Sequence, residues 1–536
     1  MKRLALLALL CLLVGPLTVV RAGKVLLLPL PEDNSHIFVL RRIYDELTQR
    51  GHNAYMLVPP GDVPRLTAID KGENVSHITF NIESMDLQRV ALTLSSSSHG
   101  PKDIDLVMKL WHAQCDTLLS DADLMERLQA DKPDVILGIP FFSCTSLLGA
   151  KLGVPYMYLL PTGMLGNAHM SSIWSGSGRD FHIAPRLATV ADMHVHASHP
   201  LTFFQRMQNA WTFANIHQHD YRVLRPTMLN LQRKHGIDLT APEARRLQSL
   251  TLMSADMALE TPRPLPPTVK MVGPILAKPA KPLPSDLQEF MDGAGENGVV
   301  LISLGTLAQF GRDEMQMIAS ALKRLPARTL WKLSSREVEA AGGLEALNLT
   351  ENVKVVSWVP QNDVLGHPRT RAFLSHCGSN GMYEAVYHGV PIVAMPFFAD
   401  QPMNAQKVVS KGMAAMLPRE GLTAEGVYDA LTRVLEDGSY RAAAAKLSKR
   451  IRSRKRTPLQ EAADWVEHVL DTSGEPYLQL PDEDMNFIVR TSLDVIAAYL
   501  AIAVSSLSLG VILVQWIVGS ALPKLKGLAG WKEKIV

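Results

Sequence analysis

The chain has 536 residues, of which 47% are hydrophobic and 20% are charged. This length is sufficient for two or more domains with ordinary hydrophobic cores. Because 54 basic and 52 acidic residues nearly cancel, the formal net charge is only +2, and this balance gives no indication of a nucleic-acid-binding protein. The one dense basic run, from Lys449 to Arg456, adjoins an amphipathic segment and is predicted to be a solvated helix face.

The first 22 residues have the anatomy of a secretory signal peptide. Lys2 and Arg3 precede an apolar run at 4–14, and Ala22 is a small residue at the expected cleavage position. The apolar run is too short to span a bilayer. Residues 1–22 are therefore predicted to be a signal peptide that is cleaved before Gly23.

The next region alternates between short apolar runs and helical periodicity. A helix is predicted from about His36 to Arg50, where Gly51 ends it. Alternating strands and helices predict a parallel sheet with right-handed crossovers. Residues 162–250 have an irregular helical pattern, rich in His, Met and Trp. This N-terminal domain is assigned to residues 23–284, with strands at 24–28, 54–58, 134–137 and 154–160.

Eight prolines lie between Pro262 and Pro284, and this segment is predicted to be a linker. A second alternation begins with an apolar strand at 299–303, which is followed by Leu304-Gly305-Thr306. A turn of this kind can place backbone amides and the Thr306 hydroxyl beside a phosphate group. The second domain is assigned to residues 285–480, with a further strand at 353–357.

The most informative stretch of this second domain surrounds a glycine-bearing turn. A short strand at 372–375 leads into this turn, and a helix follows it until Gly389. Such a turn directs unpaired backbone N–H groups and the positive helix end at one point, which suits a pyrophosphate. His376 lies in the turn and can add a donor. Asn380 and Glu384 share one helix face, and a carboxylate there suits the hydroxyl groups of a ribose.

A further strand at 392–395 is followed by a loop that reaches Asp400 and Gln401. Ligands of open α/β sheets bind at this carboxyl end of the strands, and an Asp-Gln pair there can hold sugar hydroxyls. Taken one at a time, these side chains could equally be helix caps or solvated polar groups. Together, at this spacing, they favour a nucleotide-sugar site.

A second apolar segment, at 493–519, is long enough to span a membrane and carries no charge between Val495 and Val518. Four lysines and one glutamate follow it: Lys524, Lys526, Lys532, Glu533 and Lys534. The excess of positive charge predicts that the tail, 520–536, is cytosolic and that the preceding domains are lumenal. The lysines near the terminus resemble a dilysine retrieval signal. We expect a single-pass type I protein of the endoplasmic reticulum membrane.

Three cysteines remain in the mature chain: Cys115, Cys144 and Cys377. Cys115 and Cys144 could pair in an oxidising lumen, but we predict that all three are buried thiols. Two triplets, starting at Asn74 and Asn348, are glycosylation sequons in the expected compartment.

The stretch from Trp358 to Gln401 resembles the nucleotide-sugar signature of the UDP-glycosyltransferase family. It matches W-x-P-Q-N-D, then H-x-G-x-N-G-x-x-E, then D-Q, and looks most like the membrane-bound animal UDP-glucuronosyltransferases. The resemblance extends over the whole chain and is strongest from about Pro262 to Leu470. It implies an α/β fold of the GT-B type, with two facing Rossmann-like domains and a C-terminal transmembrane helix. It also implies a UDP-sugar donor and a small lipophilic acceptor as binding partners.

The resemblance assigns roles to individual residues. It implies that the indole of Trp358 stacks on uracil, which a planar base favours, while Gln361 helps to hold the nucleoside. It also implies that His36, in the pair Ser35-His36, is the catalytic base, because a helix N-terminus keeps imidazole neutral. The donor-binding residues are then Thr306, Trp358, Gln361, His376, Gly378, Asn380, Glu384, Asp400 and Gln401. No metal and no cofactor are expected, since no Asp-x-Asp element lies beside the phosphate site.

The chain departs from the family at one position. In the family, an Asp five residues beyond a strand-initial Asp holds the catalytic His, and the same count from Asp134 reaches Ile139. Losing an orienting carboxylate can cost orders of magnitude in rate. Three explanations remain open: the base works alone on acidic acceptors, an acid from 162–250 replaces the Asp, or the protein binds UDP-sugar with little turnover.

We expect transfer of glucuronic acid from UDP-glucuronate to a hydroxyl or amine of a lipophilic acceptor, with inversion. One alternative is glucose or another hexose, because Asp400 and Gln401 would hold any of these sugars. A second is a catalytically weak partner subunit that binds nucleotide sugar, a reading motivated by Ile139. Both homo- and hetero-oligomers are compatible with the sequence.

Overall fold

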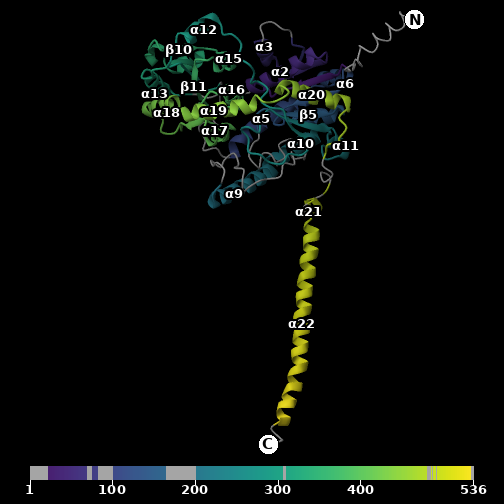
Figure 1. Ribbon diagram of the computed structural model, residues 1–536. Coiled ribbons are helices and arrows are strands. Elements are labelled where there is room, and N and C mark those ends of the chain that lie inside the picture. The colour runs from purple at the N-terminus through teal and green to yellow at the C-terminus, as the bar shows by residue number, and fades with distance from the viewer. Residues whose placement is uncertain are drawn as a thin grey trace, which may run out of the picture. The chain divides into compact units, whose positions relative to one another are not determined.

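The computed structural model describes residues 22–68, 75–82, 101–163, 201–305, 310–479, 485, 487–490 and 492–532. The chain forms two compact units, one that extends to Leu478 and one that begins at Gln479. The first unit contains two parallel sheets, each covered by helices (Figure 1). The predicted signal peptide lies outside the described residues except for Ala22, and so does the sequon at Asn74.

The first sheet has seven parallel strands in the order β3-β2-β1-β4-β5-β6-β7. The four strands predicted in this region are confirmed. The sequence analysis did not predict β3, β6 or β7, and β7 lies inside the proline-rich segment that was predicted to be a linker. The strands are β1 (Lys24–Leu28), β2 (Asn53–Val58), β3 (His77–Thr79), β4 (Val135–Gly138), β5 (Tyr156–Leu160), β6 (Gln248–Met253) and β7 (Val269–Met271).

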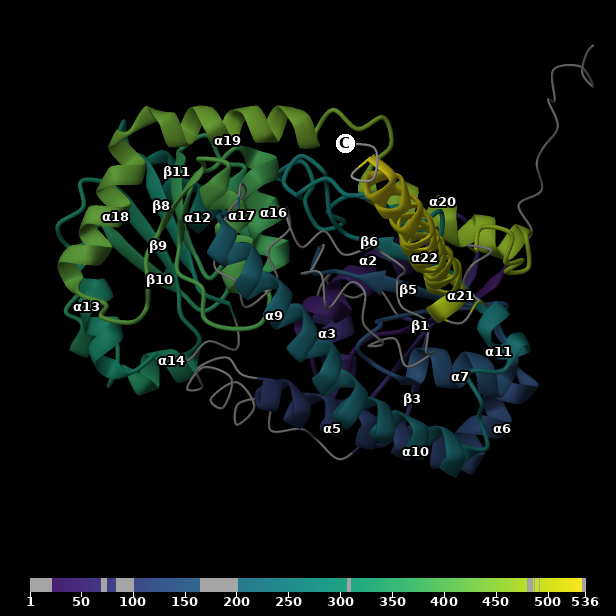
Figure 2. The same cartoon turned by 90° about the horizontal axis from the view of Figure 1, so that it is seen from below.

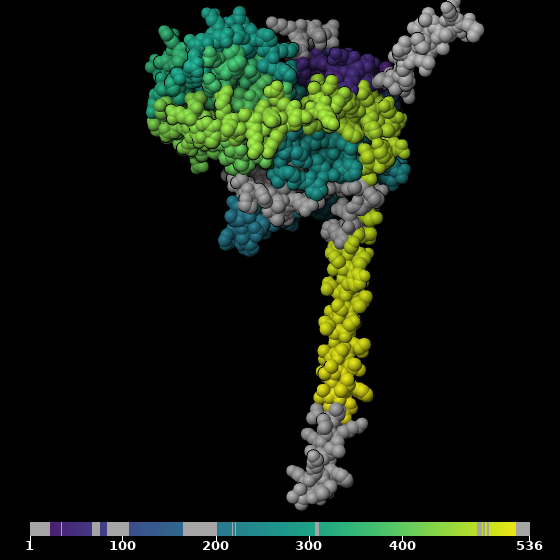
Figure 3. Space-filling view, viewed as in Figure 1, coloured from purple at the N-terminus to yellow at the C-terminus, as the bar shows by residue number. Residues whose placement is uncertain are grey.

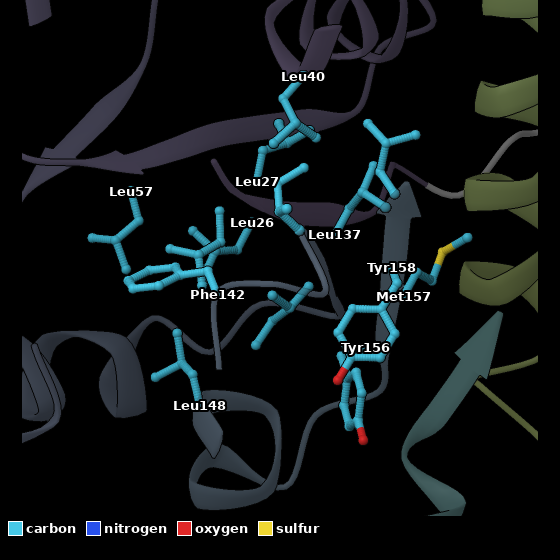
Figure 4. Packing of buried hydrophobic residues seen from close by; sticks show 14 of the residues in the cluster. Leu26, Leu27, Leu40, Leu57, Leu137, Phe142, Leu148, Tyr156, Met157 and Tyr158 are labelled. Atoms are coloured by element: carbon cyan, nitrogen blue, oxygen red, sulfur yellow. The ribbon is translucent and has the colours of Figure 1, made fainter. Parts of the chain in front are cut away.

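The central strands β1, β4 and β5 are almost entirely apolar because helices cover both faces. Leu27 of β1 is paired with Leu137 of β4, and both side chains are fully buried. Leu137 is in turn paired with Met157 of β5, and Figure 4 shows Leu27 beside Leu40. This packing holds β1, β4 and β5 firmly together, so the loops at their carboxyl ends start from fixed positions.

Helices surround this first sheet, and the predicted helix from His36 to Arg50 is confirmed as α2. Two of the helices are joined by a disulfide between Cys115 in α5 and Cys144 in α7, whose Cα atoms are 5.3 Å apart. The prediction of three free thiols was therefore wrong for this pair, because packing of α5 on α7 brings the cysteines together; Cys377 is a buried thiol as predicted. The helices are α2 (Asn34–Gln49), η1 (Pro60–Asp62), α3 (Val63–Ala68), α5 (Pro101–Ser120), α6 (Ala122–Ala130), α7 (Cys144–Leu152), α9 (Phe203–His219), η3 (Asp220–Leu224), α10 (Arg225–His235) and α11 (Pro242–Arg246).

The second sheet has six parallel strands in the order β10-β9-β8-β11-β12-β13. Both sheets thus include the doubly wound order 3-2-1-4-5-6, which reverses direction between the first and fourth strands. Four strands were predicted here, whereas β9 and β13 were not. The strands are β8 (Val299–Ser303), β9 (Arg328–Lys332), β10 (Val353–Val356), β11 (Thr370–Ser375), β12 (Ile392–Ala394) and β13 (Ala414–Met416).

Helices cover the second sheet on both faces (Figure 2). One buried cluster joins the sheet to α13 and α18, and a second joins its other face to α12, α16, α17 and α19. The helices are α12 (Ser285–Asp292), α13 (Arg312–Leu322), α14 (Ser335–Ala340), η4 (Glu345–Leu347), α15 (Gln361–Leu365), α16 (Ser379–His388), α17 (Gln401–Ser410), α18 (Ala424–Glu436) and α19 (Gly438–Ile451).

Helix α20 (Pro458–Asp471) returns to the first sheet, although the sequence-based division placed it in the second domain (Figure 3). Arg50 of α2 donates hydrogen bonds to Asp464 at 2.8 Å and to Glu467 at 2.7 Å. The apolar face of α20 lies in the core of the first domain, through Ala462, Ala463, Val466 and Val469. The N-terminal domain therefore contains a helix from the far end of the chain.

The two chain segments that connect the domains lie against each other. The guanidinium of Arg454, on the returning segment, donates to Asp256 at 2.8 Å and to the carbonyl oxygen of Met271 at 3.1 Å. Glu461 at the start of α20 also accepts a hydrogen bond from Arg454. One side chain thus ties the returning segment to the end of the first sheet.

A buried ion pair also joins the two domains. The Nζ of Lys407 in α17 lies 2.8 Å from Oε1 of Glu260, which is only 1% exposed and belongs to the first domain. The Tyr383 hydroxyl in α16 donates to the same oxygen at 3.1 Å. Helix α16, which begins in the glycine turn, is therefore anchored to the first domain through Tyr383.

The second compact unit contains α21 (Phe487–Arg490) and the long helix α22 (Leu493–Lys532). Within α22, the segment Leu493–Ser520 has a mean hydropathy of 2.3 and is long and apolar enough to cross a membrane. The predicted span at 493–519 coincides with this segment.

Candidate functional site

The candidate site lies where both sheets reverse their strand order. In the first sheet Leu28 of β1 is level with Gly138 of β4, and in the second Ser303 of β8 is level with Ser375 of β11. The chain segments that leave these four strand ends carry most of the polar residues singled out from the sequence. Crevices at such reversals are where ligands of open α/β folds bind.

The turn between β11 and α16 is held by its own polar groups. The N–H of Cys377 donates to the Ser375 hydroxyl at 3.1 Å, and the Cys377 carbonyl accepts from Asn404 at 3.1 Å. Cys377 has a φ of +61°, a left-handed conformation that costs energy for a residue with a side chain. No side chain caps the start of α16 at Gly378, so its first N–H groups remain open to an anion.

The imidazole of His376 fits between two glycines. A Cβ atom at Gly378 would lie 2.5 Å from its Nε2, and one at Gly305 would lie 2.9 Å from the same atom. Burial lowers the pKa of His376 to about 4, and the nearby Lys332 cation acts in the same direction, although a hydrogen bond with the Ser303 backbone opposes them. His376 is therefore neutral near pH 7 and carries a single N–H.

Lys332 is a candidate site residue that the sequence analysis missed. It ends β9, and its Nζ lies 3.4 Å from the carbonyl oxygen of Gly305. Burial lowers its pKa from the ordinary value for lysine, against the opposing influence of Glu337. A partly desolvated cation beside the glycine turn is well placed to attract phosphate. Its signal in the sequence was its position at the carboxyl end of a strand, but that strand itself was not predicted.

Gln361 and Glu384 form a polar pair at the start of α15 and on α16. The Gln361 side-chain amide donates to Glu384 Oε2 at 2.6 Å. Burial raises the pKa of Glu384 to about 7, because the hydrogen bond from Gln361 only partly offsets the loss of solvation. Trp358 lies in the loop between β10 and α15, and it is 68% exposed, which leaves a broad aromatic face open to solvent.

The loop after β12 holds Asp400 and Gln401. Gln401 Oε1 accepts hydrogen bonds from the N–H groups of Phe397 at 3.0 Å and Phe398 at 3.4 Å, so this side chain also shapes the loop. Burial raises the pKa of Asp400 to about 6, although a 2.7 Å hydrogen bond from Asn404 and the nearby Lys407 and His36 all favour its ionised form.

His36 reaches this group of residues from the first domain. It lies in the first turn of α2, and its imidazole is only 10% exposed. The side chain of Asn380 in α16 donates to the carbonyl oxygen of Ser35 at 3.4 Å. The structure therefore brings the Ser35-His36 pair of the first domain against Asn380 and near Asp400 of the second.

Ile139, where the family has an Asp, follows β4 and is completely buried. Among the described residues, His36 instead has an ion-pair contact with Asp33, whose Oδ2 lies 3.0 Å from the imidazole Nδ1. The sequence analysis did not consider Asp33.

Thr306 lies outside the described residues, and residues 164–200, within the segment expected to provide a replacement acid, do so as well.

Within the part of the chain that the structure describes, no three His, Cys, Asp or Glu side chains are grouped as metal ligands. Among the described residues, the positive character of the site comes from Lys332 and from the open start of α16, while neutral His376 adds no charge.

Comparison with known proteins gives the family. A family model described as UDP-glucoronosyl and UDP-glucosyl transferase matches residues 23–520. The chain belongs to this family of UDP-glycosyltransferases. Its relatives include UDP-glucuronosyltransferase 2A2 of Mus musculus, 31% identical over 89% of this chain and 91% of the relative. Another is the 2-hydroxyacylsphingosine 1-beta-galactosyltransferase of Rattus norvegicus, 30% identical over 89% of this chain and 85% of the relative.

Solved structures confirm the predicted GT-B fold of this UDP-glycosyltransferase. The calicheamicin glycosyltransferase CalG4 matches with a TM-score of 0.59 and 20% identity, over 84% of this chain and 98% of that protein. Os79 from O. sativa, solved in complex with UDP, matches with a TM-score of 0.58 and 18% identity, over 83% of this chain and all of that protein.

Proposed function

We propose that this UDP-glycosyltransferase transfers glucuronic acid from UDP-glucuronate to a hydroxyl or amine of a small lipophilic acceptor. The observation that carries the proposal is that Asn380 of the second domain donates to the carbonyl oxygen of Ser35, next to His36, and that His36 is close enough to Asp400 to lower its pKa. This proximity supports the role of His36 as a base beside the donor sugar. Similarity to animal UDP-glucuronosyltransferases supports the choice of sugar.

The donor is bound by groups of the second domain. Trp358 stacks on the uracil ring, and the Gln361–Glu384 pair accepts the ribose hydroxyls. The diphosphate lies at the start of α16, where open N–H groups, His376 and Lys332 offset its charge. Asp400 and Gln401 hold the sugar hydroxyls, and Thr306 adds a hydroxyl donor to the phosphates.

The first domain supplies the acceptor site and the base. The acceptor hydroxyl gives its proton to Nε2 of His36 as its oxygen attacks the anomeric carbon of the sugar. The bond between that carbon and the β-phosphate oxygen breaks, and the electron pair leaves with UDP. Attack on the face opposite the leaving group inverts the anomeric centre. The donors around the diphosphate stabilise the charge that develops on UDP, so we propose that no metal ion is required.

A hexose donor is the second candidate, because a galactosyltransferase is among the relatives at 30% identity. The groups proposed to contact the sugar, Asp400 and Gln401, bind hydroxyls that glucuronate, glucose and galactose share.

We also propose that the catalytic domains face the lumen of the endoplasmic reticulum. The Cys115–Cys144 disulfide supports an oxidising compartment, and the apolar segment of α22 supports a membrane anchor. Asn348, in one of the two sequons, is exposed and accessible to glycosylation there.

Product formation in microsomes that express the protein tests the proposal. Labelled UDP-glucuronate, UDP-glucose and UDP-galactose are supplied separately with a panel of phenols and amines, with and without a chelator. We expect transfer from UDP-glucuronate that survives chelation and that His36→Ala reduces by about 100-fold or more. His77→Ala, which changes an exposed histidine on β3, is the matched control and leaves the rate unchanged.

Three results would contradict the proposal. Transfer from a hexose donor but not from UDP-glucuronate would show that the proposed sugar is wrong. Undiminished transfer by His36→Ala would show that His36 is not the base. Binding of UDP without turnover of any donor favours a partner subunit that binds nucleotide sugar.

A further inference from the structure

The Asp33 carboxylate has a separate partner on each of its oxygens. Oδ1 accepts from the N–H of Ser35 at 2.8 Å, from the Ser35 hydroxyl at 2.6 Å and from the N–H of His36 at 3.4 Å. These contacts make Asp33 the N-cap of α2. Oδ2 lies 3.0 Å from Nδ1 of the His36 ring. Asp33 therefore contacts the imidazole with an oxygen that the helix cap does not use.

These contacts determine which ring nitrogen of His36 carries the proton. The Ser35 hydroxyl donates its hydrogen bond to Asp33. Its oxygen, 3.1 Å from Nδ1 of His36, can therefore only accept a hydrogen bond from that nitrogen. Two acceptors beside Nδ1 require a proton on that nitrogen, which leaves the lone pair on Nε2. Nε2 is buried and has no hydrogen-bond partner. The free base position is therefore the nitrogen that points away from Asp33.

Asp33 remains ionised across the working range of pH. Burial alone would raise the pKa of its carboxyl group, but the charge of His36 and the hydrogen bonds from His36 and Ser35 outweigh burial and hold the pKa well below its usual range. An ionised carboxylate at Nδ1 stabilises the imidazolium that forms when Nε2 accepts a proton.

We propose that Asp33 is the positioning residue for His36 and supplies the orienting carboxylate that this chain lacks at Ile139. The inference rests on the proposed role of His36 as the base. The Ile139 side chain is aliphatic and fully buried, so it offers no acceptor to the imidazole. Asp33 and His36 lie three residues apart at the start of one helix, so the pair needs no second strand to hold it.

The test is the steady-state kinetics of Asp33→Asn in the full-length membrane protein. Asparagine is as good an N-cap as aspartate, so the helix start and the Tm are preserved. The substitution removes the charge and presents an amide to Nδ1, which disfavours the productive tautomer. We expect kcat to fall by about 100- to 10,000-fold with little change in KM for donor or acceptor. Asp121→Asn changes the equivalent cap of α6, whose side chain accepts from Leu124, and leaves kcat unchanged.

Acceptor acidity gives a second readout that a purely structural role would not move. Across a series of substituted phenols, the loss of kcat in Asp33→Asn should shrink as the phenol becomes more acidic, because an ionised phenol needs no base. A uniform loss along the series would contradict the proposal and indicate damage to the fold.

A further variant keeps the proposal falsifiable if Asp33→Asn is unstable. Asp33→Ser also provides an N-cap but no carboxylate, and it should be equally impaired. If either variant retains its kcat while His36→Ala is inactive, the role of Asp33 is overturned and the proposed function stands. If His36→Ala is fully active, the role of His36 fails and the inference fails with it.

Discussion

The side-chain amide of Gln361 lies 2.6 Å from Oε2 of Glu384 and joins the first residue of α15 to a buried position on α16. The pKa of Glu384 is raised to about 7 by burial, so part of the free protein carries a proton there at neutral pH. Hydroxyl groups that donate to this carboxylate would stabilise its charged form and lower its pKa.

Binding of UDP near pH 7 should therefore release a fraction of a proton. Calorimetry in two buffers with different ionisation enthalpies measures this release, and Glu384→Gln should abolish it and weaken binding. UDP is used without a sugar so that Asp400 is not engaged. Proton uptake on binding, or release that Glu384→Gln leaves intact, would contradict the proposed ribose contact.

Replacing Trp358 should weaken UDP binding without affecting stability. The indole is 68% exposed and contributes little to the core, whereas stacking on one base is worth about 1–3 kcal/mol. We expect Trp358→Ala to raise the Kd for UDP by about 5- to 150-fold with an unchanged Tm. Trp211→Ala, an equivalent change at a 70% exposed indole on α9, is the control. Equal UDP affinities in both variants would rule out stacking at Trp358.

A methyl group at Gly378 should displace His376. The φ of Gly378 is −57°, so alanine fits the backbone, but its Cβ would lie 2.5 Å from Nε2 of His376. We expect Gly378→Ala to lower kcat/KM for the donor by at least about tenfold and to cost about 1–3 kcal/mol of stability. Gly438→Ala, where the added methyl meets open space at the start of α19, should change neither. Full activity of Gly378→Ala would mean that His376 does not serve the donor site.

The Lys407–Glu260 ion pair should be costly to break from one side only. Lys407→Met leaves the fully buried Glu260 carboxylate with only the Tyr383 hydroxyl, which costs about 3–5 kcal/mol and lowers the Tm. Adding Glu260→Gln to Lys407→Met should restore much of the lost stability, because no buried charge then remains unpaired. Glu425→Gln, which breaks an exposed ion pair with Arg324, is the control and should leave the Tm unchanged. Additive losses in the double variant would show that the two residues are not coupled.

Strands that are apolar along their whole length could be predicted from the sequence, because a sheet covered on both faces leaves no room for polar side chains. The missed strands lack this signal. Strand β9 starts with Arg328 and ends with Lys332, and β13 is only three residues long, two of them alanine. Strand β7 is concealed by the prolines on both sides of it. These strands form because their neighbours in the sheet offer backbone partners.

The candidate site could be predicted where its residues are close together in the chain, as from Trp358 to Gln401. Contacts that depend on packing were not visible. Cys115 and Cys144 pair because α5 meets α7, and Lys332 approaches Gly305 because two strands lie side by side. The contact between Asp33 and His36 differs from these, because it lies within one short stretch of the chain. An aspartate at the start of a predicted helix is a local signal for an N-cap, and this signal was overlooked.

The return of α20 to the first sheet changes how the two halves of this protein are connected. The second domain is an insertion within the first, reached by one outgoing and one returning segment that Arg454 fastens together. The two crossings are adjacent, and the contacts of Arg454 with Asp256 and Met271 hold the returning one against the end of the first sheet. Since the apolar segment of α22 follows α20 in the chain, it is connected to the half that holds His36 and not to the half that holds the glycine turn.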